Sequence, residues 1–477
     1  MPASRGAGIL GRTRPPLPPP MHPLAPRLVR GQRVVTPDGV RPAAIHVERG
    51  RITRIGDVTD AAPAGADVLD AGELVVLPGL VDTHVHVNEP GRTEWEGFAT
   101  ATRAAAAGGV TTLLDMPLNS VPATTTADAL VAKARAALGQ VWVDVGFIGG
   151  VVPGNALELR ALHRAGALAF KCFLVPSGVD EFPHVVESDL RGAMPVLAEL
   201  GAVLMVHAEL PSVIESAGRA AVTGADPRRY ETYRASRPPA AEREAVALVV
   251  RLAAASGARA HVVHVSSAET VPVIGAARAR GVAVTAETCP HYLALDASLV
   301  PDGATEYKCA PPIRDAADRD ALWAALGAGA LDMVVSDHSP CPPAMKERET
   351  GDFFAAWGGI ASLQLGASVV WSGMRARGLP IERLARWMSD APARLIGLGG
   401  RKGRIEAGHD ADLCVFDPDA EWTVSADALL HRHPLTPYLG LPLRGVVAAT
   451  YVRGVLAYDR REGPAPVPGG RLLLPPA

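Results

Sequence analysis

The sequence predicts an α/β protein that combines a TIM (β/α)8 barrel with a small β-sandwich domain formed from the N- and C-terminal segments. Three observations support this fold class. Eight apolar, strand-like runs alternate with Ala-, Leu- and Arg-rich helical stretches in the middle of the chain. Short strand patterns separated by Gly-containing turns occupy both ends. The chain has 477 residues, of which 48% are hydrophobic and 20% charged, as in a globular protein with a large core.

The N-terminal part of the β-sandwich is predicted over residues 27–79. Short apolar runs there are separated by a Pro-Asp-Gly turn at 37–39 and by Arg49-Gly50, which is typical of a meander or sandwich. Residues 1–26 hold eight Pro and no Asp or Glu, and they lack the apolar stretch of a signal peptide. We expect this head to be a disordered Pro-rich extension.

The barrel is predicted over residues 80–394. Continuous apolar strands that alternate with helices indicate a parallel sheet covered on both faces. The helical stretches include 99–107, 127–137, 158–165, 242–255 and 317–326. The eight strand-like runs end near His86, Asp115, Gly146, Lys171, His207, His264, Glu287 and Asp337.

Short strand patterns return over residues 395–465, and a tail follows at 466–477. Because chain termini of a compact domain often lie close together, we expect the two β-rich ends to join into one sandwich beside the barrel.

Composition excludes several classes of protein. The formal net charge of −3 does not suit an electrostatic nucleic-acid binder. No apolar run is long enough to span a membrane, and no glycine-rich phosphate loop is present. The five Cys are odd in number and widely spaced, which indicates free thiols in a reducing compartment. We therefore expect a cytoplasmic protein that acts on a small molecule.

A metal site is predicted at the mouth of the barrel. His84 and His86 are two residues apart at the end of the first strand, so both rings face the same way and can bind one divalent ion. Polar side chains at the carboxyl ends of barrel strands converge on one mouth. The further candidates at such ends are Lys171, His207, His264 and Asp337.

Lys171 is the unexpected member of this group, because an ammonium ion is repelled by metal cations. The pKa of a lysine shifts readily on burial, and a neutral amine is nucleophilic. Addition of carbon dioxide would convert Lys171 into a carbamate with two oxygen donors, which is suited to bridge two metal ions. We therefore hypothesise that Lys171 is carboxylated.

The motifs that carry these residues resemble the amidohydrolase superfamily, and within it the cyclic-amidase branch of dihydroorotases, hydantoinases and allantoinases. The resemblance runs from about residue 27 to about 465 and rests on residues 81–86, 170–173, 207–209, 264–267, 336–338 and 402–412. Several stretches are similar to allantoinases in particular: 89–98, 115–119, 308–315, 336–346 and 357–360. Dihydroorotases carry an Arg where this chain has Asn88, and a neutral residue there suits a substrate without a carboxylate.

The resemblance implies metal-dependent hydrolysis of allantoin to allantoate. It implies that His84, His86 and Asp337 hold one ion, His207 and His264 hold the other, and carboxylated Lys171 bridges them with a hydroxide. The ions would be Zn, with Fe, Co or Mn also compatible with these donors. Asp337 would move the proton from water to the leaving nitrogen. It also implies substrate contacts from Cys309, Ser339 and Asn119, and a homotetramer.

Two other functions stay open at this point. The first is another cyclic amidase, a hydantoinase or dihydropyrimidinase. The second is a non-catalytic scaffold, since some relatives of hydantoinases have lost their metal ligands and act as binding proteins. The presence of all six ligand positions argues against the scaffold.

Overall fold

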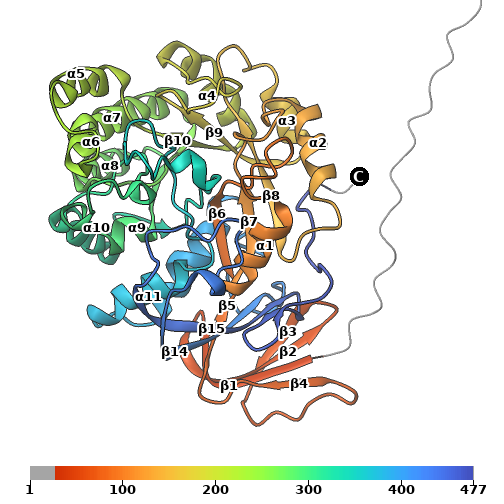
Figure 1. The fold of residues 1–477 in the computed structure, drawn as a ribbon. Helices are drawn as coiled ribbons and strands as arrows, with labels where there is room; N and C mark the ends of the chain where they lie inside the picture. The colour runs from red at the N-terminus through yellow and green to blue at the C-terminus, as the bar shows by residue number, and fades with distance from the viewer. Residues whose placement is uncertain (1–26, 476–477) are drawn as a thin grey trace, which may run out of the picture.

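The eight predicted barrel strands form one parallel sheet (Figure 1). The computed structural model describes residues 27–475. Within this range the strands lie in chain order around the barrel: β6 (Leu80–Val85), β7 (Val110–Asp115), β8 (Asp144–Gly150), β9 (Ala167–Phe173), β10 (Val203–His207), β11 (Arg259–Val262), β12 (Val284–Thr288) and β13 (Met333–Val334). A parallel bridge between Val85 and His338 joins the segment that follows the last strand to the first strand. The predicted barrel is confirmed.

Helices surround the sheet in the described part of the chain (Figure 1). Their ends follow sequence signals: Thr126 and Asp315 accept backbone N–H groups at two N-termini, and Gly201, Gly257 and Gly329 end helices in the left-handed conformation. The helices are α1 (Phe98–Ala107), α2 (Ala127–Ala137), α3 (Leu159–Ala165), α4 (Glu187–Leu200), α5 (Pro211–Val222), α6 (Tyr230–Ser236), α7 (Pro239–Ser256), α8 (Val271–Ala279), α9 (Pro290–Ala294), α10 (Ala316–Ala328), α11 (Gly366–Ala376), α12 (Glu382–Ala385) and α13 (Ala391–Leu395).

Both ends of the described chain build a second, separate sheet of nine strands. The two ends meet where β14 pairs antiparallel with β5, with Cys414 opposite Leu77. In Figure 1 these strands lie together beneath the barrel, as the sequence predicts. They are β1 (Arg27–Thr36), β2 (Gly39–Glu48), β3 (Arg51–Gly56), β4 (Asp67–Asp70), β5 (Val75–Pro78), β14 (Leu413–Thr423), β15 (Pro442–Val452), β16 (Val455–Asp459) and β17 (Gly463–Pro464).

Some details differ from the sequence prediction. Strand β8 continues past Gly146 to Gly150, because Gly149 and Gly150 adopt extended backbone and keep pairing with β9. Residues 470–473, within the predicted tail, lie along β8 with hydrogen bonds to the backbone of Val141 and Val145. The predicted extension at 1–26 lies outside the described residues.

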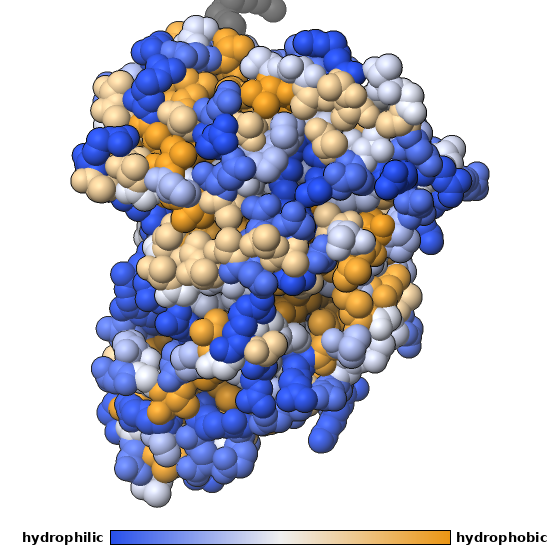
Figure 2. Space-filling view, turned by 90° about the vertical axis from the view of Figure 1, so that its left-hand side faces the viewer, coloured by the Kyte–Doolittle hydropathy of each residue, from blue (hydrophilic) through white to orange (hydrophobic). Residues whose placement is uncertain are grey.

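The surface mixes apolar and hydrophilic side chains on the side of the molecule that Figure 2 shows. Among the described helices, none combines the length and apolar character needed to cross a bilayer.

A buried ion cluster connects the barrel to the second sheet. The Nζ of Lys402 lies 2.8 Å from Asp144 on β8, 2.6 Å from Asp412 and 3.3 Å from Asp410, and it is fully buried. Burial opposes the charge on this lysine, but Asp412 and Asp144 raise its pKa above the ordinary value. Lys402 therefore holds three carboxylates that would otherwise repel one another.

Replacing Lys402 by methionine should destabilise the protein by about 3–5 kcal/mol, because it leaves the buried carboxylate of Asp412 without its ion-pair partner and takes one of two partners from Asp144 and Asp410. The measurement is urea unfolding followed by circular dichroism. Arg160→Met, which breaks the exposed pair with Glu199, is the control and should cost about 0–1 kcal/mol. Equal losses in the two variants would contradict this role for Lys402.

Candidate active site

All nine predicted site residues line one cavity of about 650 Å³ at the carboxyl ends of the barrel strands. They come from seven different strand ends or the loops that follow them, so only the closed barrel brings them together. The nine are His84, His86, Asn119, Lys171, His207, His264, Cys309, Asp337 and Ser339.

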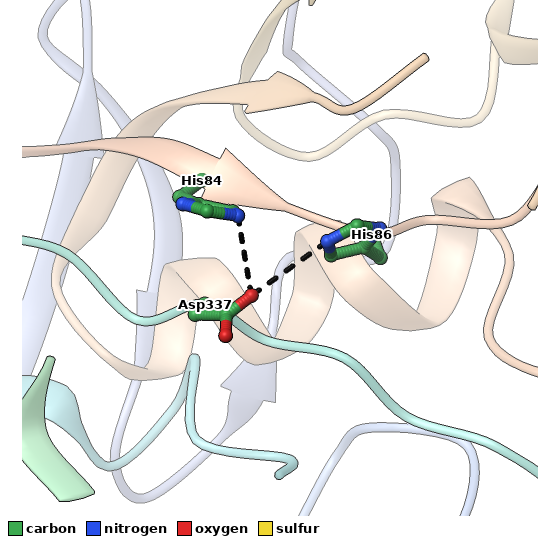
Figure 3. Close-up of side chains that lie close together, drawn as sticks. All are labelled: His84, His86 and Asp337. Atoms are coloured by element: carbon green, nitrogen blue, oxygen red, sulfur yellow. Dashed lines mark ion pairs between the residues drawn. The ribbon is translucent and has the colours of Figure 1, made fainter. Parts of the chain in front are cut away.

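His84, His86 and Asp337 form a tight group (Figure 3). The Oδ1 atom of Asp337 lies 3.2 Å from the Nε2 of His84 and 3.6 Å from the Nε2 of His86. His84 belongs to β6 and His86 follows it, so their rings face the same side as the two-residue spacing predicts. Asp337 reaches them from the loop after β13, the neighbouring strand in the closed barrel.

The rings of His207 and His264 lie next to this group. The centroids of His207 and His264 are 4.6 Å apart, and those of His84 and His264 are 5.5 Å apart. The ring of His207 also stacks on Phe173 at 4.7 Å. Burial lowers the pKa of His84, His207 and His264, so these imidazoles stay neutral and offer lone pairs.

Lys171 lies on β9 with its side chain completely buried. Its Nζ has no hydrogen-bond partner and lies 5.1 Å from the centre of the Phe173 ring. Burial lowers the pKa of Lys171 to about 8, although Asp337 and Glu287 act in the opposite direction. A larger fraction of this amine is therefore neutral near neutral pH than in an ordinary lysine.

Backbone strain is concentrated at the site. His264 and Asp337 adopt φ values of 41° and 44°, in the left-handed region that residues other than glycine seldom occupy. Such conformations cost about 1–3 kcal/mol each and persist where the surrounding structure enforces them, often at functional sites. His264 lies two residues after the end of β11, and Asp337 lies three residues after the end of β13.

The contacts of His84 test whether these residues fit a metal ion. The Nδ1 of His84 lies 2.6 Å from the buried carboxylate of Glu287, so this nitrogen carries the proton. The Nε2 of a neutral His84 is then a bare lone pair, 3.2 Å from the carboxylate oxygen of Asp337. Burial opposes the ionisation of Asp337, but contact with His86 keeps its pKa below the ordinary value. Two acceptors that face each other fit a cation between them.

Two further donor atoms at the site also fit a bound metal ion. Nδ1 of His264 and Nζ of Lys171 are buried without hydrogen-bond partners. Imidazoles with one carboxylate are donors that suit zinc and other divalent transition metals. His84, His86 and Asp337 themselves lie close enough together to form a candidate metal-binding cluster.

Comparison with known proteins identifies the family. The sequence profile of the amidohydrolase family matches residues 75–457. The chain belongs to the amidohydrolase family. It is 51% identical over 448 residues to an allantoinase from Streptomyces avermitilis, covering 94% of this chain and 98% of that protein. It is 43% identical to an allantoinase from Arabidopsis thaliana, covering 90% and 87%.

Among solved structures, an L-hydantoinase from Arthrobacter aurescens superposes with a TM-score of 0.89. The two sequences are 32% identical, and the match covers 94% of this chain and 99% of that one. These relatives confirm the resemblance to the cyclic-amidase branch of the amidohydrolases, and within it to allantoinases.

The three predicted substrate contacts differ in their surroundings. Ser339 donates a hydrogen bond to Oδ1 of Asp337 at 2.9 Å, so it supports this carboxylate. Asn119 lies 3.5 Å from the Nδ1 of His86, and its Oδ1 has no partner. Burial raises the pKa of Cys309 to about 12, so its thiol stays neutral. Asn88 is buried and is absent from the described lining of the cavity.

Sequence reasoning missed the carboxylates that support two of the histidines. Glu209 accepts from Nε2 of His207 at 2.7 Å and pairs with Arg237, which together hold the pKa of Glu209 at about 2 despite its burial. Glu287 contacts Nδ1 of His84, as described above. The signals were present, because Glu209 follows His207 by two residues and Glu287 ends a barrel strand.

Proposed function

We propose that this amidohydrolase cleaves the cyclic amide bond of allantoin with water to give allantoate, a step in purine (ureide) catabolism. The observation that carries the proposal is that all six candidate ligands, from five different strand ends, line one cavity. Neutral imidazoles and an ionised carboxylate at a barrel mouth suit metal-assisted hydrolysis of an amide.

The choice of substrate rests on the relatives. The proteins at 43–51% identity bear the name allantoinase, whereas the hydantoinase structure is 32% identical. This difference supports allantoin over hydantoin or a dihydropyrimidine. A scaffold without activity has no support, since no ligand position is lost.

We assign the metal ligands as the sequence predicts. One divalent ion would be held by His84, His86 and Asp337. The other would be held by His207 and His264, and N6-carboxylated Lys171 would be a ligand to both ions. When bound, such ions, of which zinc suits these donors, activate water near neutral pH and polarise the scissile carbonyl. The burial of the Lys171 amine and its lack of a hydrogen-bond partner support the carbamate.

In this proposal the side chain of Asp337 transfers one proton, and Ser339 holds Asp337 in position. The carboxylate of Asp337 takes a proton from the attacking water as the new C–O bond forms. It returns that proton to the ring nitrogen as the C–N bond breaks, so that the nitrogen leaves as a neutral group. The hydroxyl of Ser339 donates to Oδ1 of Asp337 and holds the carboxylate in place during both transfers.

A substrate panel tests the proposal. Zinc-loaded protein should hydrolyse allantoin with a kcat/KM at least about tenfold above those for hydantoin and dihydrouracil, because pocket contacts discriminate between related rings. Removal of metal by a chelator should abolish turnover, and added Zn²⁺ should restore it. Preference for hydantoin or dihydrouracil would favour the other cyclic amidases. Bound metal without turnover of any of the three would contradict a cyclic amidase.

We also propose a cytoplasmic homotetramer. All five cysteines are free and buried, which agrees with a reducing compartment. Light scattering coupled to gel filtration measures the mass of the assembly, and a monomeric mass would contradict the tetramer.

A further inference from the structure

A hydrogen-bonded chain of three buried polar groups and the half-buried Thr285 runs through the barrel interior to His84. The Oε1 of Glu287 lies 2.6 Å from Nδ1 of His84, and its Oε2 lies 2.9 Å from Nε2 of His261. The Nδ1 of His261 lies 2.7 Å from the hydroxyl of Thr285. His261 and Glu287 are completely buried, and the side chain of His84 is 1% exposed.

The position of each proton follows from what each group can donate. As a carboxylate, Glu287 only accepts, so the nitrogens of His84 and His261 that face it both carry protons. With its proton on Nε2, the ring of His261 can accept at Nδ1 from the hydroxyl of Thr285, 2.7 Å away. Each donor in this hydrogen-bonded chain therefore has an acceptor. The chain ends at Nε2 of His84, whose unprotonated lone pair faces Asp337.

The location of this chain is unusual for the fold. The interior of such a barrel is mostly filled by branched apolar side chains. Thr285 and Glu287 are two residues apart on β12 and so point to the same side, and His261 reaches them from β11. Polar groups in this place cost free energy unless each is hydrogen-bonded, and a complete chain satisfies that condition.

The other histidines of the site lack this arrangement. The Nδ1 of His86 has only the side-chain amide of Asn119 at 3.5 Å, and the Nδ1 of His264 has no partner. His207 meets Glu209 through Nε2 instead, at 2.7 Å. Among these four rings, His84 alone has its Nδ1 held by a carboxylate in the described structure.

We propose that Glu287, backed by His261 and Thr285, is a positioning residue that fixes the orientation and tautomer of His84 toward a bound metal ion. This inference rests on the proposed metal-dependent function. A carboxylate behind a metal-binding imidazole raises its basicity and prevents rotation of the ring. Glu287 would thus strengthen metal binding without touching metal or substrate.

The test is Glu287→Gln, which keeps the shape of the side chain but removes its charge. The Gln carbonyl can still accept from His84, and its amide can donate to His261 once that ring moves its proton to Nδ1. Competition with a chelator should show Zn²⁺ affinity about 10–100-fold weaker than in the unaltered protein. The unfolding midpoint of the metal-free variant should change little. Unchanged Zn²⁺ affinity would overturn the proposal.

Two further measurements separate positioning from a purely structural role. Thr285→Val removes only the last donor of the chain and should cause a smaller loss of Zn²⁺ affinity. Asp60→Asn removes the charge from a carboxylate–histidine pair far from the site, between the loop after β3 and His46 on β2 at 3.0 Å, and should leave Zn²⁺ affinity unchanged. Equal effects of Glu287→Gln and Asp60→Asn would count against Glu287.

The tautomer can be read without metal. In metal-free protein with ¹⁵N-labelled histidine, signals assigned to His84 by comparison with His84→Gln should show the proton on Nδ1. A proton on Nε2 would overturn the inference. Because this measurement does not use Glu287→Gln, it decides the question even if that variant does not fold. Unaltered protein that binds no Zn²⁺ while His84 shows the expected tautomer would instead refute the proposed metal-dependent function.

Discussion

Asp337→Asn should lower kcat for allantoin by roughly 10²–10⁴-fold while the fold is retained. Asparagine has the size of aspartate, and its amide oxygen can still accept the hydrogen bond from Ser339. It cannot accept and return a proton, however, and it is a weaker metal donor. Contact with His86 keeps the pKa of Asp337 low, so the native group is an ionised base at neutral pH.

The measurement for Asp337→Asn is steady-state turnover with metal content determined on the same sample. A variant that still binds metal but does not turn over would assign Asp337 to proton transfer, and loss of both would assign it to metal binding as well. Asp320→Asn, on the exposed face of α10, is the matched control and should leave kcat unchanged. Near-native turnover by Asp337→Asn would remove Asp337 from the mechanism.

Lys171→Ala should reduce the bound metal to fewer than two ions per chain and lower kcat by at least about 100-fold. Groups that only support metal ligands contribute about 10–100-fold, and a bridging ligand acts on both ions directly. Alanine leaves space in place of the buried amine but no donor. The measurements are elemental analysis of the purified protein and turnover of allantoin.

The neighbouring position on the same strand provides the control. Cys172 is buried in the core and is absent from the described lining of the cavity, whereas Lys171 and Phe173 belong to that lining. Cys172→Ala should keep two ions per chain. Intact-mass analysis should also find the mass of one added CO₂ in the unaltered protein but not in Lys171→Ala. Full metal content and activity in Lys171→Ala would refute the carbamate.

The local patterns were sufficient to predict the candidate ligands. The two-residue spacing of His84 and His86 on an extended strand forces their rings to one side, whatever surrounds them. His207, His264 and Asp337 each end an apolar run, and such ends meet at one edge of a parallel barrel. The position of each ligand along its strand is a local property, so it can be read from the sequence.

The supporting contacts could not be predicted in the same way. Glu287 and His84 are separated by 203 positions in the chain, and their 2.6 Å contact exists only because the barrel closes between β13 and β6. The extension of β8 to Gly150 also escaped prediction, since glycine disfavours strands unless a neighbouring strand pairs with it. The hydrogen bonds of residues 470–473 along β8 also escaped prediction, because these two segments are far apart in the sequence.

The sequence alone therefore determined the barrel, the second sheet from both chain ends, the family and the set of residues that face the mouth. Periodicity and strand ends are short-range features, and each follows from the geometry of a single element. Only the tertiary structure decided which carboxylate meets which ring nitrogen and which buried amine lacks a partner. Those properties depend on distances of a few ångströms between strands that the chain order does not specify.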